Sequence, residues 1–250
     1  MARIDGSKFS FFVLLFIFVG QSFGQTFIKE GRVVFERRTN LEKRFEGMEG
    51  NNWMRNVDLS KPQVDEFELL FDDTSSLFRP ILDQAGGGMS EWLTMKNTTY
   101  QSLTESIRKQ EFSFFGTKVL LEDSIRKRTW RMTQSSREIA GYECRQALWE
   151  VNDTLRIYAW YAEELIPPLG PETFNGLPGL ILGLAIEDGG VVYFAKDIDI
   201  KKTKEIIEQD KPKGRKKDWY TEQKLRELME DRFSQMGSAV DRLAMDVFVW

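Results

Sequence analysis

The feature that most constrains this chain is a proline-rich segment, residues 160–182, set in a sequence that otherwise favours strands. Four of the seven prolines lie in this segment. Each proline fixes its own φ and disfavours helical backbone in the residue before it, so the segment should be stiff. Pro178 and Gly179 suit the central positions of a type II turn, after which residues 180–182 should enter the core. We expect the segment to cap a sheet or to line its mouth.

Strand signals occur on both sides of this segment as short runs rich in β-branched and aromatic residues, separated by turn formers. Because these runs follow one another closely, they favour an antiparallel sheet over alternating strands and helices. Turns at residues 72–74 and 187–190 should each close a hairpin. Residues 40–63 should form a loop. The predicted strands are residues 31–37, 67–71, 76–78, 98–103, 106–112, 118–122, 128–133, 143–151, 155–161, 180–186 and 191–197.

The two ends of the chain differ from this pattern. Residues 1–24 carry a basic start, an apolar run and a small-x-small triplet, which predicts a cleaved signal peptide. The apolar run is shorter than the ~20 residues of a membrane span, so we expect an exported protein that is not integral to the membrane. Residues 25–200 should form the β domain and residues 201–220 a basic polar linker. Residues 221–250 should form a helical tail, with an amphipathic helix from Thr221 to Met236.

Composition excludes several classes of function. The chain has no histidine, one cysteine and a net charge of −4. A Ser-His-Asp triad, an imidazole metal ligand and an intrachain disulfide are therefore excluded. The acidic balance argues against general nucleic-acid binding. We assign no catalytic residue, no metal ligand and no cofactor from the sequence.

The hexapeptide Gly176–Ile181 has the sequence Gly-Leu-Pro-Gly-Leu-Ile, and related matches occur at residues 141–144, 159–161 and 170–171. In these motifs the chain resembles the GLPGLI family of exported bacterial proteins, over roughly residues 26–200. The resemblance implies a periplasmic or secreted protein of a Gram-negative bacterium rich in TonB-dependent transport. It implies no established reaction. The sheet pattern also resembles the curved half-barrels of periplasmic lipoprotein carriers, so the expected fold is mainly β (α+β), with a curved antiparallel sheet and a C-terminal helix.

The first functional hypothesis is a non-catalytic envelope binding or assembly protein. Its partner would be an apolar or lipid-like ligand or a TonB-linked outer-membrane protein, held where aromatic residues gather near the proline-rich segment. The alternative is that these aromatic residues only fill the core. The candidate binding residues are Trp160, Tyr161, Pro167, Gly170, Pro171, Phe174, Gly176, Leu177, Pro178, Gly179 and Leu180.

The second hypothesis is a carboxylate-dependent hydrolase that acts on envelope glycan or peptide. Glu163, Glu164 and Glu172 flank the stiff segment, and Asp197 and Asp199 should share one face of a strand. Paired carboxylates can divide the acid and base roles of hydrolysis. Because acidic residues are numerous, such pairs also arise by chance.

Metal binding is a third possibility. Acidic residues at 187, 188, 197 and 199 could supply oxygen ligands for calcium, although they lack the spacing of an EF-hand. Cys144 with Met132 could attract Cu(I). The alternative for Cys144 is a small apolar residue buried in a strand.

Overall fold

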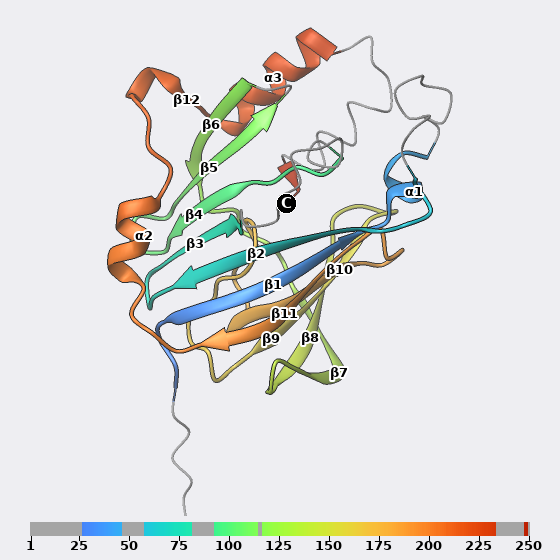
Figure 1. Ribbon diagram of the computed structural model, residues 1–250, viewed down its shortest axis with the longest axis vertical. Coiled ribbons are helices and arrows are strands. Elements are labelled where there is room, and N and C mark those ends of the chain that lie inside the picture. The colour runs from blue at the N-terminus through green and yellow to red at the C-terminus, as the bar shows by residue number, and fades with distance from the viewer. Residues whose placement is uncertain (1–26, 47–57, 82–92, 115–116, 234–247, 250) are drawn as a thin grey trace, which may run out of the picture.

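The computed structural model describes residues 27–46, 58–81, 93–114, 117–233 and 248–249 (Figure 1). The predicted signal peptide, residues 1–24, lies outside them. Twelve strands form one sheet in the order β12-β6-β5-β4-β3-β2-β1-β11-β10-β9-β8-β7. The strands are β1 (Gly31–Thr39), β2 (Gln63–Phe71), β3 (Ser75–Pro80), β4 (Thr98–Ser102), β5 (Ile107–Phe114), β6 (Thr117–Ser124), β7 (Arg131–Ile139), β8 (Tyr142–Glu150), β9 (Arg156–Ala162), β10 (Leu180–Ile186), β11 (Val191–Asp199) and β12 (Trp219–Tyr220). The helices are α1 (Leu41–Arg44), α2 (Lys204–Asp210), the 3₁₀ turn η3 (Lys216–Asp218) and α3 (Glu222–Phe233).

The first strand lies near the middle of the sheet, and the rest of the chain forms a wing on either side of it. Strands β2 to β6 follow β1 outwards in one direction, and β11 to β7 follow it in the other. Neighbouring strands are antiparallel except for β12, which pairs with β6 in parallel. Residues 125–130 must therefore connect the two wings across the open side of the sheet. This connection lies opposite the centre of the sheet, so it can contact elements that pack on the concave face.

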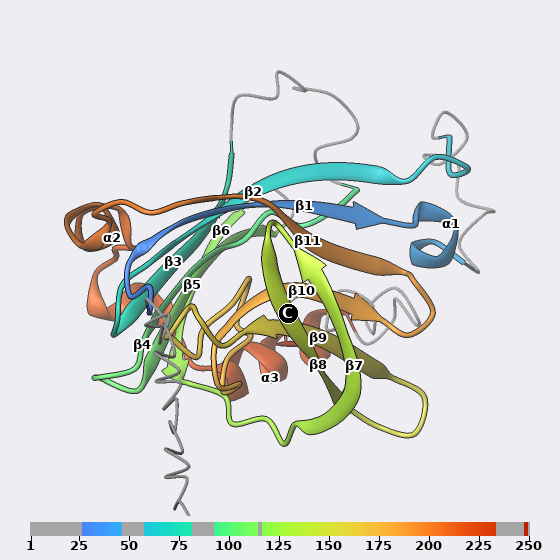
Figure 2. The same ribbon diagram turned by 90° about the horizontal axis from the view of Figure 1, so that it is seen from below.

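The sheet arches over the connection between β9 and β10 and over α3 (Figure 2). The main core lies on this concave face, where β1 and β2 place the rings of Phe35 and Phe67 opposite each other. Phe67 also stacks on Phe78 of β3, with ring centroids 4.9 Å apart. A second apolar cluster joins β5 and β6 to Leu225 and Met229 of α3. Burial of alternate strand residues thus gives a sheet with one apolar face.

The sequence predicted this architecture well. The fold is mainly β, with one open, largely antiparallel sheet, and each predicted strand overlaps an observed one. The hairpin between β2 and β3 forms around Asp72, whose carboxylate accepts hydrogen bonds from the main-chain N–H groups of Thr74 and Ser75 at 2.7 and 2.8 Å. Short polar side chains commonly close turns in this way. Strand β10 has the predicted bounds, and the hairpin to β11 is also confirmed.

Two segments differ from the prediction. Helix α1 begins within the region expected to be a loop, because the Asn40 side chain accepts a hydrogen bond from the N–H of Lys43 and caps its start. The segment expected as a linker, residues 201–220, contains α2, η3 and β12. Ile207 of α2 is fully buried, and the Thr203 hydroxyl donates to the main-chain oxygen of Phe71. Tertiary packing therefore orders a stretch whose composition is that of a polar linker.

The predicted C-terminal amphipathic helix is confirmed as α3. Leu225 and Met229 are buried against the sheet, and Leu228 is half-buried. The side chain of Phe233, which we expected on the same stripe, lies outside the described residues. Within the described part of the chain, no helix has the length and apolar character needed to cross a membrane.

Candidate functional site

The proline-rich connection between β9 and β10, residues 163–179, covers the concave face of the sheet. Polar side chains of other elements hold its backbone. Arg128 donates to the carbonyl oxygen of Thr173 at 2.7 Å, and the Trp130 indole donates to that of Asn175 at 3.0 Å. Because both donors lie on or beside the 125–130 connection between the wings, the two connections fix each other inside the arch.

The turn into β10 differs from the predicted type II turn, in which Gly179 would have a φ of roughly +80° and the N–H of Leu180 would commonly donate to the carbonyl of Leu177. Instead the N–H of Gly179 donates to Leu177 at 2.8 Å, as in a γ-turn centred on Pro178, and Leu180 donates to Leu165. The prediction was wrong because a long-range backbone bond competes for the Leu180 donor. Gly179 is still required. Its φ is +152°, and a Cβ there would lie 2.2 Å from the carbonyl oxygen of Ala162.

Most of the candidate binding residues predicted from the sequence lie inside the core. Their aromatic members belong to two separate groups. Trp160 lies beside Phe194, with ring centroids 5.6 Å apart, whereas Phe174 packs with Trp149 and Trp130 at 6.1 and 6.3 Å. Gly176 and Pro178 are exposed. The buried members are Trp160, Tyr161, Pro167, Gly170, Pro171, Phe174, Leu177, Gly179 and Leu180.

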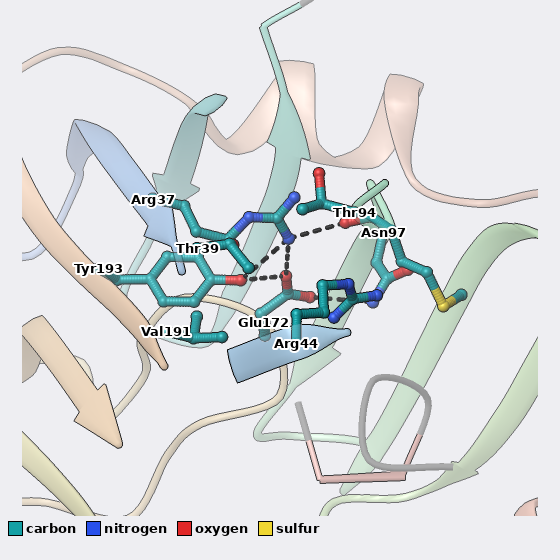
Figure 3. Close-up of a pocket in the computed structure, with 9 residues that line it drawn as sticks. Arg37, Thr39, Arg44, Thr94, Asn97, Glu172, Val191 and Tyr193 are labelled. Atoms are coloured by element: carbon teal, nitrogen blue, oxygen red, sulfur yellow. Dashed lines mark hydrogen bonds and ion pairs between the residues drawn. The ribbon is translucent and has the colours of Figure 1, made fainter. Parts of the chain in front are cut away.

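A cluster of buried charge lies where β1, β2 and β11 meet this connection (Figure 3). Arg37 of β1 donates to the Asp65 carboxylate of β2 at 2.8 Å, and its Nη1 lies 4.0 Å from the Glu172 carboxylate. The Tyr193 hydroxyl of β11 donates to Glu172 at 2.8 Å. Arg37, Glu172 and Tyr193 line a hollow with room for about one water molecule. We call this group, Arg37, Asp65, Glu172 and Tyr193, the Arg37 cluster.

The charges in the Arg37 cluster stabilise one another. Burial alone would lower the pKa of the Arg37 guanidinium, but Tyr193, Asp65 and Glu172 raise it above its ordinary value. Burial would raise the pKa of the Asp65 carboxyl, yet its ion pair and hydrogen bond with Arg37 hold that pKa below its ordinary value. Burial, followed by the nearby Glu172 carboxylate, raises the pKa of Tyr193 well above its ordinary value. The Arg37 guanidinium thus compensates the charge of two carboxylates, and the Tyr193 phenol stays protonated beside Arg37 and Glu172.

Glu172 has a strained backbone. Its φ is +54°, in the left-handed region that residues with a Cβ rarely adopt. The side chain is 1 % exposed. Asn97, in the segment before β4, also donates to its carboxylate at 3.4 Å. Strain of this kind persists only where surrounding contacts hold it. The contacts of Glu172 with Tyr193 and Asn97 therefore keep this carboxylate inside the arch.

A row of polar side chains continues from Asn97 along the concave faces of β4 and β5. The strand register sets Thr99 opposite Gln110 and Gln101 opposite Arg108. These four residues, which we call the polar band, are at most 1 % exposed. Gln101 donates to the carbonyl oxygens of Glu172 and Phe174 and accepts from Asn175. It therefore ties the band to the proline-rich connection.

The other members of the polar band are incompletely bonded. Five buried atoms have no hydrogen-bond partner among the described residues: the Thr99 hydroxyl, both amide atoms of Gln110, and Nε and Nη1 of Arg108. More than 90 % of buried polar groups in native proteins are paired, and each unpaired one costs about 1–3 kcal/mol. Several such atoms lie on facing residues of two strands. A further polar group at this position would supply the hydrogen-bond partners that they lack.

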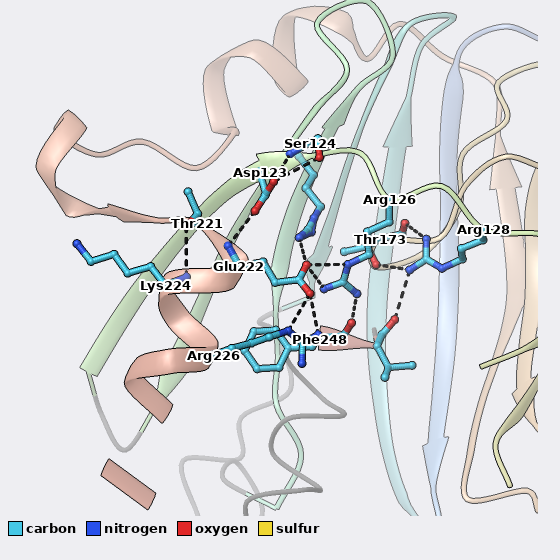
Figure 4. Close-up of polar contacts among 12 residues, drawn as sticks. Asp123, Ser124, Arg126, Arg128, Thr173, Thr221, Glu222, Lys224, Arg226 and Phe248 are labelled. Atoms are coloured by element: carbon cyan, nitrogen blue, oxygen red, sulfur yellow. Dashed lines mark hydrogen bonds and ion pairs between the residues drawn. The ribbon is translucent and has the colours of Figure 1, made fainter. Parts of the chain in front are cut away.

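The far end of the polar band meets α3 in a cluster of arginines (Figure 4). Arg108 and Arg126 both donate to one carboxylate oxygen of Glu222, at 2.5 and 2.8 Å, and Arg226 donates to the other at 2.7 Å. Arg128 donates to Thr173 and lies over the Phe174 ring. We call these residues, Arg108, Arg126, Arg128, Arg226 and Glu222, the Arg108 cluster. Positive charge exceeds negative charge within it.

The remaining sequence candidates do not join these clusters. Glu163 and Glu164 are exposed, and so are Asp197 and Asp199. Among the described residues, no three Cys, Asp or Glu side chains gather as they would around a metal ion. Cys144 is fully buried, and burial raises the pKa of its thiol to about 12. Of the five carboxylates considered for hydrolysis, the structure brings only Glu172 into the interior.

Sequence reasoning missed Arg37 and the whole polar band. The band does leave one signal. In Thr98–Ser102 and Ile107–Phe114, alternate positions that should face the core carry polar residues. Polar residues at alternate positions normally indicate the solvent face of a strand, which is why these four residues did not stand out.

Comparison with known proteins gives a match to a family over part of the chain and a similarity of fold. Residues 148–183, from β8 through the proline-rich connection into β10, match a family described as "Protein of unknown function (Porph_ging)". No curated protein matches the chain. Two solved structures of PNGF-II, in C2 and P21 space groups, have a similar fold, with TM-scores of 0.51 and 0.52 and sequence identities of 14 % and 12 %. They cover 78 % and 80 % of this chain but only 31 % and 33 % of their own, so this chain spans about a third of their length.

Proposed function

We propose that this chain is a non-catalytic binding protein of the cell envelope, of the GLPGLI type, and that it holds a polar ligand against the polar band. The observation that carries the proposal is the set of buried polar atoms on Thr99, Arg108 and Gln110 that have no partner in the part of the chain that the structure describes. A ligand with hydroxyl, carbonyl or anionic groups would satisfy them. The fold otherwise bears the cost of their burial without compensation.

Two features of the sequence support the envelope as the place of action. The first 24 residues have the pattern of a cleaved signal peptide. The hexapeptide Gly176–Ile181, on which the GLPGLI resemblance rests, lies inside the segment that matches the Porph_ging family. A periplasmic or secreted location remains part of the proposal.

The polar band supports a polar ligand over the apolar or lipid-like one expected from the aromatic residues. Trp160 and Phe174 are 7 % and 0 % exposed and already pack with other rings. Their contacts belong to the core. Gln110, in contrast, is fully buried, and its side chain makes no hydrogen bond with any residue that the structure describes.

The test is native mass spectrometry of the protein purified from the periplasm of a Gram-negative host. We expect wild type to carry a bound polar compound, and Gln110→Met, which removes both unpaired amide atoms at similar volume, to lose it. Gln223→Met, on the exposed face of α3, is the matched control and should retain it. Circular dichroism confirms that each variant is folded. A folded wild type without bound compound would overturn the proposal, as would a lipid or an outer-membrane protein that stays bound to Gln110→Met.

Glu172 supports a second candidate function, the carboxylate-dependent hydrolase. A buried carboxylate on strained backbone, bonded to a phenol and beside a hollow, is an arrangement found at catalytic sites. This candidate predicts that Glu172→Gln abolishes hydrolysis of envelope glycan or peptide fragments by the folded protein. Activity that Glu172→Gln leaves unchanged would exclude this role for the carboxylate.

A further inference from the structure

The Arg108 cluster contains more cationic groups than its carboxylate can serve. Glu222 accepts from Arg108, Arg126 and Arg226 together. Asp123, on the neighbouring strand, is engaged by the N–H of Glu222 at 2.9 Å. Among the described residues, Arg128 makes no ion pair with any carboxylate. A buried charge is stable when it is paired and hydrogen-bonded, and here part of the positive charge is not.

The electrostatics agree with this geometry. Burial, and then the positive charge of Arg108, lower the pKa of Arg126 to about 10. Burial and the neighbouring Arg126 lower the pKa of Arg128 to about 9. Both groups remain protonated at neutral pH, so the arginines of the cluster repel one another. A bound anion would reduce that repulsion.

Main-chain carbonyl groups near the C-terminus occupy part of the cluster. Arg126 donates to the carbonyl oxygen of Phe248, and Arg128 donates to that of Val249 at 3.3 Å. The Phe248 ring is buried among apolar residues of β5, β6 and α3, with the Arg226 guanidinium 3.8 Å from its centroid. A carbonyl oxygen is a weaker partner for a guanidinium than a carboxylate or a phosphate oxygen. The C-terminal segment therefore covers the arginines without neutralising them.

Arg108 is buried and keeps two donor nitrogens from which no described residue accepts, whereas Arg37 and Arg128 each keep one. The Arg108 side chain is 1 % exposed, and while its Nη2 reaches Glu222, its Nε and Nη1 have no partner. Gln110 stands two residues along the same strand, on the same face, with its amide unpartnered. The Nε–H and Nη1–H groups of a guanidinium point in different directions, so an oxyanion here would accept charge-assisted hydrogen bonds from Nη1 and from the adjacent amide.

We propose that Arg108, with Gln110 beside it, binds an oxyanion of the ligand, a carboxylate or a phosphate group, and that the Phe248–Val249 segment competes with the ligand for the neighbouring arginines. This inference rests on the proposed binding function and specifies the chemistry of the ligand. Arg126 and Arg128 would exchange the carbonyl oxygens of Phe248 and Val249 for oxygens of the anion. Loosening the C-terminal segment should then strengthen binding.

The experiment is isothermal titration of the mature chain with sodium glucuronate, sodium phosphate and glucose, at constant ionic strength set with sodium chloride. We expect saturable one-to-one binding of glucuronate or phosphate, and which of the two binds more tightly identifies the carboxylate or the phosphate form. Glucose, which has hydroxyl groups but no charge, should bind at least tenfold more weakly.

Three variants and one matched control locate the site. Arg108→Gln should weaken anion binding at least tenfold, and Arg108→Lys should restore part of it, because the charge returns without the planar fork. Arg215→Gln, which removes an exposed arginine, is the matched control and should bind like wild type. Phe248→Ala should bind the anion several-fold more tightly than wild type, since it loosens the competing segment. This last variant keeps the inference testable even if the Arg108 variants do not fold.

The inference is overturned if neither anion saturates the folded wild type, if Arg108→Gln binds as well as Arg215→Gln does, or if Phe248→Ala weakens binding. These results are distinct from failure of the proposed function. A neutral polar compound that co-purifies with wild type and is lost from Gln110→Met would uphold the binding function while excluding the oxyanion.

Discussion

Arg37 and Arg108 are both buried arginines on the concave face of one sheet, with β2, β3 and β4 between their strands, but their surroundings differ. Arg37 shares its charge with Asp65 and Glu172, and Phe67 lies under its guanidinium with the ring centroid 4.6 Å away. Arg108 shares Glu222 with two other arginines, and among the described residues its Nε and Nη1 both lack partners, whereas Arg37 lacks one only at Nε. The positive charge of Arg37 is thus balanced by the protein's own carboxylates, with Lys96 3.7 Å from Asp65 as a second cation, whereas positive charge exceeds negative charge in the Arg108 cluster.

This difference separates a structural role from a binding role. A balanced buried cluster fixes how elements pack, because removing one member leaves the others uncompensated. Unpaired buried donors give the folded chain no such benefit, and their cost is recovered only when something binds to them. The same residue type, at similar burial on the same face, can therefore serve the fold in one place and a ligand in the other.

The largest effect should come from breaking the balanced cluster. Asp65→Ala leaves Arg37 buried with only Glu172 to compensate it, and we expect the free energy of unfolding in urea to fall by about 3–5 kcal/mol. Asp58→Ala, at an exposed ion pair with Lys61, should not change it measurably. Equal midpoints for the two variants would show that the Arg37 cluster contributes nothing to stability.

A somewhat smaller effect should follow from disturbing the connection that touches both clusters. Gly179→Ala places a Cβ against the Ala162 carbonyl on a backbone that disfavours it, and we expect a loss of about 3 kcal/mol in the free energy of unfolding. Gly189→Ala, also at positive φ but with nothing within 4 Å, should cost about 1 kcal/mol. Thermal unfolding of both proteins measures the difference. If the two losses are the same, the close approach at Gly179 is not a constraint.

Two glutamines of the polar band allow the same comparison at equal burial, because the amide of Gln101 is hydrogen-bonded and that of Gln110 is not. Gln101→Met removes a fully bonded amide, leaves its partners unsatisfied and should lower the free energy of unfolding by about 2 kcal/mol. Gln110→Met removes an amide without partners and should raise it by about 1 kcal/mol. Urea titration of the two ligand-free variants gives the sign of each change. Loss of stability in both would mean that Gln110 is already satisfied in the native protein.

The smallest effect concerns pH. Folding keeps Tyr193 protonated above its ordinary pKa of about 10, because burial and Glu172 oppose the phenolate. The unfolded chain loses that proton near pH 10, so the contribution of Tyr193 is complete below pH 10 and declines as pH rises further. Between pH 10 and 11, we expect wild type to lose about 1 kcal/mol more in the free energy of unfolding than Tyr193→Phe. Parallel stability curves over this interval would contradict the assignment.

The sequence by itself determined the strands, the hairpins and the stiffness of the proline-rich connection, because each depends on residues close together in the chain. Alternation marked the strands, turn formers marked their ends, and apolar spacing marked α3. The turn at Pro178 was the local feature predicted incorrectly. Its outcome depended on Leu165, which takes the hydrogen bond of Leu180 and lies outside the turn.

Only the tertiary structure decided where charge is balanced. Glu222 reaches Arg108 across 114 positions of the chain, and Tyr193 reaches Arg37 across 156. Such contacts depend on the order of strands in the sheet, and the local pattern of a strand does not specify its neighbours. The same pattern places Gln101 and Gln110 alike on a polar strand face. Because other segments cover that face, among them the proline-rich connection that bonds Gln101 and the helix α3 that meets Arg108, it becomes interior, and what would have been solvated surface becomes a row of buried donors and acceptors.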